Sequence, residues 1–313
     1  MMQIYLPDKE TELSAFAKLD LKGTAVALGQ FDALHAGHRD IICDVANYAR
    51  QNGLKSVVYM FENTPNDVVS GDTTLSVNTL EKRFEIIKDL GIDIVIARRF
   101  DEGIMKLSCA EFIEHYICNM LNARYITVGY NYRFGNKGEG SAESLAEKCN
   151  LRGIKVHIVP EVRLGGVSVS STAIREIISL GDVETAAQLM GRRFSICGRV
   201  VEGNKIGREL GFPTANMEIP KGMLIPKFGV YETRTHINGK VYPSVTNVGG
   251  KPTVDNASFC IETHICEEIG DIYGEVIEVE FCSFLREIER FDSLGCLAEQ
   301  LRKDKEQVIN NKQ

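Results

Sequence analysis

Two histidines lie three positions apart in the segment "VALGQFDALHAGH", at His35 and His38, in a chain with only six histidines among 313 residues. An apolar run that reads as a strand ends before them, and a helical pattern begins after them. Helix-start amides and the helix dipole attract anions at such a junction. Both imidazoles could therefore donate to one phosphate, and Gly37 would let the backbone approach it. This chemistry suits nucleotidyl transfer, which stabilises charge on the α-phosphate. Spacing alone equally allows two ordinary polar loop residues.

The elements that must position these histidines alternate between strands and helices. Glycine and capping pairs mark the helix ends, with Asn78 and Glu81 before one helix and Ser108 and Glu111 before another. Alternation of this kind predicts right-handed crossovers and a doubly wound α/β domain whose parallel sheet is covered on both faces. The ligand crevice of such a sheet lies where strands give way to helices. The expected strands are 24–31, 55–61, 93–100 and 125–132, and the expected helices are 39–53, 78–91 and 108–122.

The pattern changes near residues 190–194. Short β-rich segments then follow one another between Gly, Pro and Asn turns, and a single helix comes last. This order predicts a small antiparallel barrel that carries a helix on its outside. The expected strands are 194–203, 229–239, 240–250, 258–267 and 275–285, and the expected helix is 292–309.

Composition restricts the classes of partner and compartment. The net charge of −7 argues against broad affinity for nucleic acid or an anionic membrane, but permits a local basic pocket for a phosphorylated small molecule. No apolar run approaches the roughly 20 residues of a membrane span, and the first residues are too polar for a secretory signal. Nine cysteines without a C-x-x-C pair favour neither a zinc site nor a disulfide framework. The cytoplasm is the expected compartment, and the oligomeric state has no signature in the sequence.

Several motifs carry a family resemblance. The segment "GQFDALHAGH" resembles the G-x-F-D-x-x-H-x-G-H signature of nucleotidylyltransferases, and "SVSSTAIREIISLGDVETAAQLMGRRF" resembles their S-S-T-x-I-R segment. The segment "VGYNYRFGNKGEG" is similar to a flavin-site loop, and "GRVVEGNKIGRELGFPTAN" and "CIETHI" are similar to kinase motifs. Their order along almost the whole chain resembles bacterial bifunctional riboflavin kinase and FMN adenylyltransferase. The resemblance implies a Rossmann-like nucleotidylyltransferase domain at 1–187 and a β-barrel riboflavin kinase domain at 188–313.

The resemblance also implies roles in the first domain. His35 and His38 would hold the ATP phosphates and stabilise the α-phosphate while the FMN phosphate attacks it. Asn131 and Arg133 would lie at the flavin. Taken singly, Ser and Thr at a helix start are also ordinary N-caps, and an arginine there can be a solvated charge. The further residues expected to bind the nucleotide are Gly29, Phe31, Asp32, Gly37, Ser170, Ser171, Thr172 and Arg175.

In the second domain the resemblance implies separate chemistry. Glu262 would take the proton of the ribityl 5′-hydroxyl as it attacks the γ-phosphate of ATP, although a strand glutamate usually faces solvent. Thr214 and Asn216 of P-T-A-N would offer oxygens to Mg²⁺. His264 points the same way as Glu262 along a strand and is interpreted as structural. The residues expected to bind the nucleotide in this domain are Gly203, Gly207 and Arg208.

The implied activity converts riboflavin to FMN and FMN to FAD, with two ATP consumed and pyrophosphate released in the second step. Some positions depart from the family pattern. Asn63 and Thr64 in "FENTP" replace a proline and a histidine, Ala33 replaces a common glycine, and Asn131 and Tyr132 replace Asp-Phe. An alternative is therefore a riboflavin kinase alone, with a degenerate or altered first domain. A non-catalytic flavin- or nucleotide-binding regulator is a third hypothesis.

Overall fold

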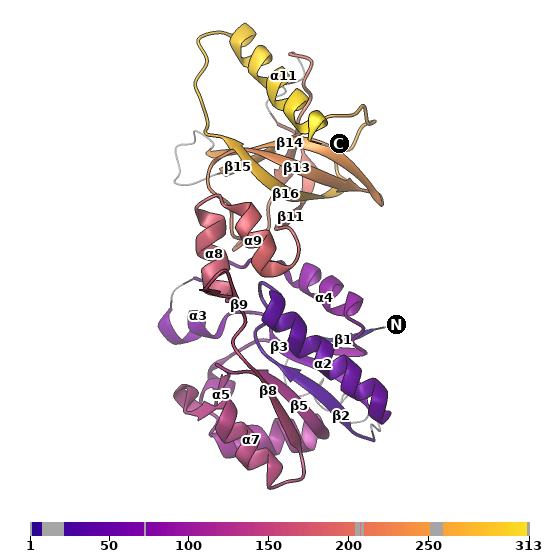
Figure 1. Cartoon of the computed structure of the whole chain (residues 1–313), viewed down its shortest axis with the longest axis vertical. Helices are drawn as coiled ribbons and strands as arrows, with labels where there is room; N and C mark the ends of the chain where they lie inside the picture. Colours follow the sequence, from indigo (N-terminus) through magenta and orange to yellow (C-terminus); the bar gives the residue numbers. More distant parts are fainter. Residues whose placement is uncertain are drawn as a thin grey trace. The chain divides into compact units, whose positions relative to one another are not determined.

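The computed structural model describes residues 2–7, 22–71, 73–203, 207, 210–250 and 259–311 (Figure 1). The chain divides into two compact units, which are described separately here. The first comprises Met1–Leu75 and Leu80–Ser171, and the second comprises Ser76–Thr79 and Thr172–Gln313. The structural division thus falls before the expected functional boundary at 187/188, and that boundary stays a prediction.

The first unit is built on a six-stranded sheet with the order β1-β4-β3-β2-β5-β8. All of its pairings are parallel. The strand order reverses between β2 and β5, so the crevice at their carboxyl ends is the switch point of a doubly wound sheet. The predicted α/β class is confirmed. The strands are β1 (Gln3–Tyr5), β2 (Thr24–Leu28), β3 (Lys55–Phe61), β4 (Ile94–Arg98), β5 (Ala123–Gly129) and β8 (Lys155–Val159).

Helices connect these strands. Gly53 ends α2 in the left-handed conformation with a φ of 64°, and Ser108 forms the predicted capping box with Glu111. The single helix expected over 108–122 instead changes to a π-helix after Phe112, and its wider turns keep Ile113 and Ile117 in the core. The helices are α2 (Ala36–Asn52), α3 (Pro65–Ser70), α4 (Leu80–Asp89), α5 (Glu102–Met105), α6 (Cys109–Phe112), η1 (Ile113–Met120), η2 (Asn136–Gly138) and α7 (Ala142–Asn150).

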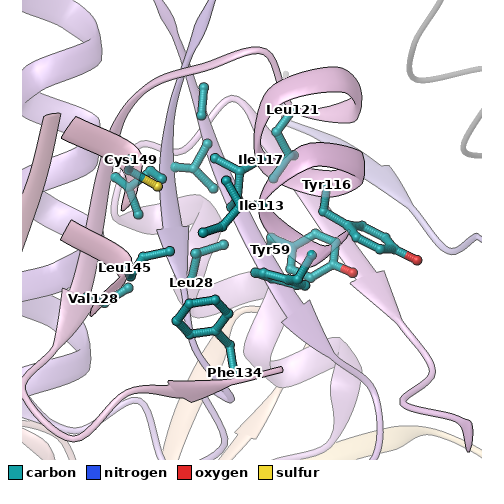
Figure 2. Close-up of a cluster of buried hydrophobic side chains, with 14 of the residues drawn as sticks. Leu28, Tyr59, Ile113, Tyr116, Ile117, Leu121, Val128, Phe134, Leu145 and Cys149 are labelled. Atoms are coloured by element: carbon teal, nitrogen blue, oxygen red, sulfur yellow. The ribbon is translucent and has the colours of Figure 1, made fainter. Parts of the chain in front are cut away.

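Each face of the sheet has its own core, because successive side chains of a strand point to opposite faces. On one face Leu28 and Val128 pack with residues of α6, η1 and α7 (Figure 2). On the other face Ala27 and Met60 pack with residues of α2 and α4. The short remaining strands of this unit are β6 (Arg133–Phe134), β7 (Gly140–Ser141), β9 (Arg163–Leu164) and β10 (Val167–Ser168).

The second unit contains a closed barrel with the strand order β11-β12-β15-β14-β13-β16. All of its pairings are antiparallel. The barrel and its terminal helix confirm the prediction. Strand β12 was not expected, because it has only four residues and begins inside the P-T-A-N motif. The elements are α8 (Ser171–Ser179), α9 (Val183–Met190), β11 (Ser195–Val201), β12 (Ala215–Glu218), β13 (Gly229–Ile237), β14 (Lys240–Gly250), β15 (Phe259–Ile265), β16 (Val276–Arg286) and α11 (Leu294–Asn310).

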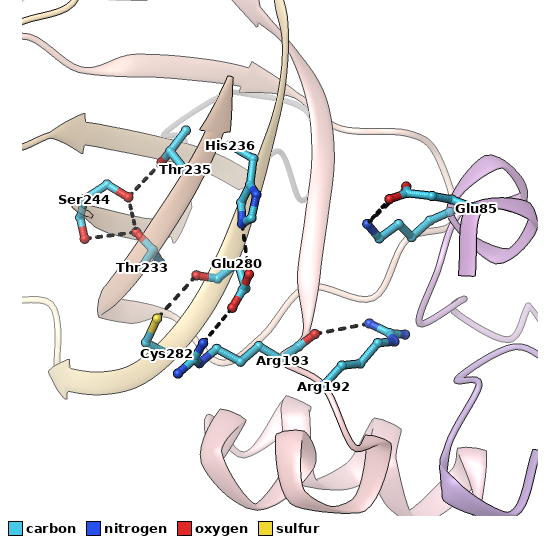
Figure 3. A network of polar contacts seen from close by, with 10 residues as sticks. Glu85, Arg192, Arg193, Thr233, Thr235, His236, Ser244, Glu280 and Cys282 are labelled. Atoms are coloured by element: carbon cyan, nitrogen blue, oxygen red, sulfur yellow. Dashed lines mark hydrogen bonds and ion pairs between the residues drawn. The ribbon is translucent and has the colours of Figure 1, made fainter. Parts of the chain in front are cut away.

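Polar contacts hold this barrel from inside and outside. In the interior, the hydroxyl of Thr233 lies 2.8 Å from that of Ser244 (Figure 3). It lies 2.8 Å from the hydroxyl of Thr246 as well, so buried oxygens satisfy one another. Near the start of β11, Glu280 accepts from Arg193 and pairs with His236, each at 2.9 Å. These contacts lower the pKa of the Glu280 carboxyl against the opposing effect of its burial.

Candidate active sites

The two histidines of the opening motif lie together after β2. His35 is the N-cap of α2, and its Nδ1 accepts from the backbone N–H of His38 at 3.3 Å. The two rings stack with their centroids 3.7 Å apart. Because Nδ1 of His35 accepts, a neutral His35 ring carries its proton on Nε2. That N–H remains able to donate to a ligand at the helix start.

Burial decides the charge of both rings. Desolvation lowers the pKa of His35 to about 4. Desolvation and the proximity of His35 lower the pKa of His38 well below its usual value. Nδ1 of His38 is buried and has no hydrogen-bond partner within the part of the chain that the structure describes. The pair is therefore neutral at neutral pH, and an incoming phosphate would favour protonation.

The loop before the histidines has a constrained backbone. Phe31 and Leu34 are fully buried and have positive φ angles of 49° and 48°, which are uncommon for residues other than glycine. A Cβ at Gly29 would lie 2.8 Å from the Phe31 ring, so this position requires glycine. The Phe31 ring in turn meets the ring of His38 at a centroid distance of 5.1 Å. The motif residues Gly29 and Phe31 thus support His38 through packing.

Arg83 on α4 is a buried positioning residue that was not expected. It is 3% exposed, and its guanidinium donates to the carbonyls of Gln30, Phe61 and Glu62 at 3.3, 3.0 and 2.8 Å. Arg83 thus connects the end of β3 with the backbone segments that follow β2 and β3, at the crevice. The sequence signal for it was a charge among the apolar residues of an amphipathic helix, because Arg83 lies between Leu80 and Ile87 on that stripe.

The "FENTP" departure also has a structural role. The Asn63 amide donates to the Phe100 carbonyl at 3.1 Å and accepts from the Phe100 N–H at 2.7 Å. The backbone carbonyl of Asn63 accepts from the Gln30 side chain at 2.9 Å. These contacts connect the segments that follow β2, β3 and β4. Thr64 is the N-cap of α3 but makes no side-chain capping bond.

The expected flavin residues follow β5, beside the histidines at the switch point. Asn131 and Arg133 are both exposed, and Arg133 begins β6, which pairs with Ser141. The ring of Tyr132, which lies between these two residues in the sequence, stacks with the ring of Phe134 at a distance of 6.0 Å between the ring centroids. This edge therefore presents an exposed amide and an exposed cation, which suit a phosphorylated ligand, while the two rings pack with the core of the first unit.

The S-S-T-x-I-R segment runs across the structural division. Ser170 and Ser171 end the first unit, and Thr172 and Arg175 belong to the second. Ser171 begins α8, and Thr172 is exposed on its first turn. Their approach to His35 and His38 stays a prediction.

The second unit has a cavity of about 670 Å³ beside β12. Three of the expected site residues line it, namely Gly203, Thr214 and Asn216. Glu262 is half-buried and is not among the described residues that line this cavity. It pairs directly with Asn216 across the β12–β15 ladder. Because paired residues share a face of the sheet, the carboxylate and the amide lie side by side. Other lining residues are Pro213, His264, Glu267, Glu268, Asp271, Tyr273 and Lys305.

Close packing explains Gly203 and Gly207, two glycines of the Gly-rich turn that precedes P-T-A-N. A Cβ at Gly203 would lie 2.2 Å from the Asn216 amide nitrogen, and one at Gly207 would lie 2.4 Å from the Phe212 carbonyl. Gly207 also accepts from the Phe212 N–H at 2.8 Å. The turn therefore rests against the P-T-A-N segment. Arg208 lies outside the described residues.

The oxygens of this site fit a magnesium ion. Thr214 offers a hydroxyl and Asn216 an amide oxygen, and Mg²⁺ prefers oxygen ligands that include substrate phosphates and water. In the part of the chain that the structure describes, no group of three or more His, Cys, Asp or Glu side chains could hold a metal ion.

Replacement of Gly203 by alanine tests this packing. We expect Gly203→Ala to lower the riboflavin phosphorylation that the family resemblance implies by about 10²-fold, because a new Cβ must displace Asn216 and a 1 Å displacement can cost that much. Gly295→Ala is the matched control, since its nearest atom would be Ser293 Oγ at 3.6 Å. Initial rates of ATP-dependent flavin phosphorylation measure both. Equal activity of the two variants would contradict the assigned role of Gly203.

Comparison with known proteins gives a consistent result for both units. The family described as FAD synthetase matches residues 17–173, and the family described as riboflavin kinase matches residues 190–311. The bifunctional riboflavin kinase/FMN adenylyltransferase of Listeria monocytogenes is 34% identical over 284 residues, which cover 90% of each chain. The protein of the same name from Haemophilus influenzae is 31% identical over 288 residues, which cover 91% of this chain and 93% of that one.

A solved structure shares the fold over nearly the whole chain. It is a crystal structure named a macrolide-efflux protein from Streptococcus pneumoniae, with a TM-score of 0.85, 31% identity, and coverage of 93% of this chain and 96% of that one. Within the described ranges of the present chain, no helix has both the length and the apolar character needed to cross a membrane. With both domain families matched in order and relatives above 30% identity over nine-tenths of the chain, the protein belongs to the bifunctional riboflavin kinase/FMN adenylyltransferase family.

Proposed function

We propose that this chain makes FAD from riboflavin in two steps. ATP phosphorylates riboflavin to FMN with release of ADP, and a second ATP adenylylates FMN with release of pyrophosphate. The observation that carries this proposal is the presence of two separate sites in one chain. One is the histidine pair at the switch point of the first unit, and the other is the group of Thr214, Asn216 and Glu262 in the barrel.

In the kinase step the attacking group is the ribityl 5′-hydroxyl, a weak nucleophile at neutral pH. Glu262 accepts its proton as the new bond to the γ-phosphate forms and the bond to the ADP leaving group breaks. ATP would bind in the cavity that Thr214 and Asn216 line. Mg²⁺ held by these two residues would neutralise phosphate charge. The contact of Gly203 with Asn216 keeps that amide in place.

In the adenylyl step the attacking group is the phosphate of FMN, which is already ionised. The protein must therefore position two anions and stabilise the charge that develops on the α-phosphate. His35 presents Nε2–H at the start of α2, and His38 stacks on it. Asn131 and Arg133 would receive the flavin and its phosphate at the neighbouring strand end. Ser170, Ser171, Thr172 and Arg175 would bind the ATP phosphates.

One incubation separates the three functional hypotheses. Purified protein is mixed with riboflavin, ATP and Mg²⁺, and the flavins are separated by chromatography. Accumulation of FAD supports the bifunctional assignment. FMN alone would restrict the chain to riboflavin kinase activity, and the absence of any product would favour a flavin- or nucleotide-binding regulator.

The proposed division into domains gives its own prediction. A fragment of residues 188–313 contains the whole proposed kinase site, so it should phosphorylate riboflavin without the rest of the chain. The longer fragment 172–313 should melt at a higher temperature, because it retains residues 172–187 of α8 and α9, with buried side chains such as Ile178 and Val183. Circular dichroism checks folding and initial rates measure activity. A folded 188–313 fragment that bound ATP and riboflavin without making FMN would disprove the division.

We also infer that the protein works in the cytoplasm. None of the nine cysteines forms a disulfide bond, and cysteines in the thiol form are typical of a reducing compartment. Both proposed reactions use ATP.

A further inference from the structure

His264 lies in the wall of the cavity, two residues after Glu262 on β15. Residues two apart on a strand share a face, so His264 is on the same side of the sheet as Glu262 and Asn216. It is 6% exposed. A histidine buried next to a proposed phosphoryl-transfer site requires a physical explanation, because a buried polar ring must satisfy its nitrogens.

One ring nitrogen has a defined partner. Nδ1 of His264 lies 2.9 Å from the carbonyl oxygen of Pro213. A carbonyl only accepts, so Nδ1 carries the hydrogen. Burial lowers the pKa of His264, which agrees with a neutral ring. Nε2 is buried and has no partner among the described residues, and the ring meets Phe212 edge-on at a centroid distance of 5.4 Å.

The contact lies where regular pairing ends. Strand β12 begins at Ala215, which pairs with Thr263, and the described residues before it form no ladder pair with β15. Pro213 also lacks a backbone N–H that could fix it. The His264 side chain therefore holds Pro213, which lies two residues before the first ladder residue and directly before Thr214. At the other end of the motif, Cys260 Sγ lies 3.2 Å from Asn216 Oδ1.

We propose that His264 is a positioning residue of the kinase site, whose Nδ1–H holds the Pro213 carbonyl and thereby orients the Thr214 hydroxyl toward the nucleotide phosphates. This inference rests on the proposed function for the role of Thr214. It replaces the interpretation of His264 as structural only. The ring contacts no reacting atom, so its effect must pass through the backbone of Pro213 and Thr214.

The tautomer of His264 gives a test that does not depend on activity. Two-dimensional ¹H–¹⁵N NMR of the full chain with ¹⁵N-labelled histidine resolves the nitrogens of six rings, and loss of one set of signals in His264→Asn assigns this ring. The expected result is a neutral ring protonated at Nδ1. A ring protonated at Nε2, or at both nitrogens, at neutral pH would overturn the proposed contact.

Two substitutions test the consequence. His264→Phe keeps a ring but removes the donor, and His264→Asn places an amide N–H near the position of Nδ1. We expect His264→Phe to raise the KM for ATP in FMN formation by about 5- to 10-fold, the usual effect of one lost hydrogen bond, with the KM for riboflavin within twofold. His264→Asn should recover most of the loss. Equal ATP kinetics of wild type and His264→Phe would refute the proposal, as would an asparagine variant no better than phenylalanine.

A second histidine of the barrel is the matched control. His236 also makes one 2.9 Å contact, with Glu280, and it lies outside the cavity lining formed by described residues. His236→Phe should lower the melting temperature without raising the KM for ATP. If it raised the KM for ATP as much as His264→Phe does, the effect would be general destabilisation. If the wild type formed no FMN, the proposed function would fail, and the NMR measurement would still decide the contact.

Discussion

Glu262→Gln should reduce FMN formation by roughly 10²- to 10⁴-fold, the usual contribution of a positioned general base. Glutamine keeps the shape of the side chain but cannot take the proton of the 5′-hydroxyl. Glu262 pairs with Asn216 across the ladder, and glutamine can keep the polar contacts of that position. We therefore expect the affinity for ATP to change much less than the rate.

Both half-reactions are measured on one preparation of this variant. Adenylylation of added FMN should continue, because its attacking phosphate is already ionised and its proposed residues lie outside the barrel. Glu268→Gln is the matched control, since it removes a carboxylate from the cavity lining without touching the ladder. Collapse of both activities together would make Glu262 a structural residue, and an unchanged rate of FMN formation would place the base elsewhere.

The fold could be predicted in detail because its signals are local. Strand β3 was expected with its observed bounds, and Gly53 and the pair of Ser108 and Glu111 mark helix ends as predicted. The change to a π-helix after Phe112 was missed, because an amphipathic pattern does not distinguish the two helical widths over one or two turns. Strand β12 was missed because four residues carry too little periodicity to reveal a strand.

The candidate site residues differ in how well the sequence alone could predict them. His35, His38 and Thr214 stand in compact motifs, so the resemblance of those motifs to a known family proposed them as site residues. Arg83 and His264 act through backbone carbonyls of distant segments, Gln30 and Phe61 for the one and Pro213 for the other. Such contacts depend on which loops meet at the end of a sheet, and no local spacing encodes that. A charged or polar residue at an apolar position was the only available signal.

The histidine pair illustrates how the two kinds of information combine. Spacing suggested that both imidazoles donate to one phosphate. The structure assigns Nδ1 of His35 to the cap of α2, which leaves only Nε2 of that ring to donate. His38 has no capping task, and its buried Nδ1 lacks a partner among the described residues. Of the two, His38 is thus the ring whose loss should remove ligand chemistry with the least damage to the helix start.

His38→Ala should slow conversion of supplied FMN to FAD by about 10²-fold or more, the effect of removing one donor that stabilises charge in the transition state. FMN formation from riboflavin should stay within twofold. His157→Ala is the matched control, because it removes another histidine of the first unit, one that contacts Asp44 at 3.1 Å. Rates with supplied FMN and with riboflavin are compared for both variants.

The same measurements show whether His38 acts in catalysis or in packing. Its ring stacks on His35 and meets Phe31, so alanine also removes contacts from the loop. Loss of packing alone would lower the melting temperature of the first unit and would be restored by His38→Phe. Loss of a donor would leave phenylalanine as inactive as alanine, while asparagine, which keeps an N–H, would recover part of the rate. Normal FAD formation by His38→Ala would return the residue to the role of an ordinary loop histidine.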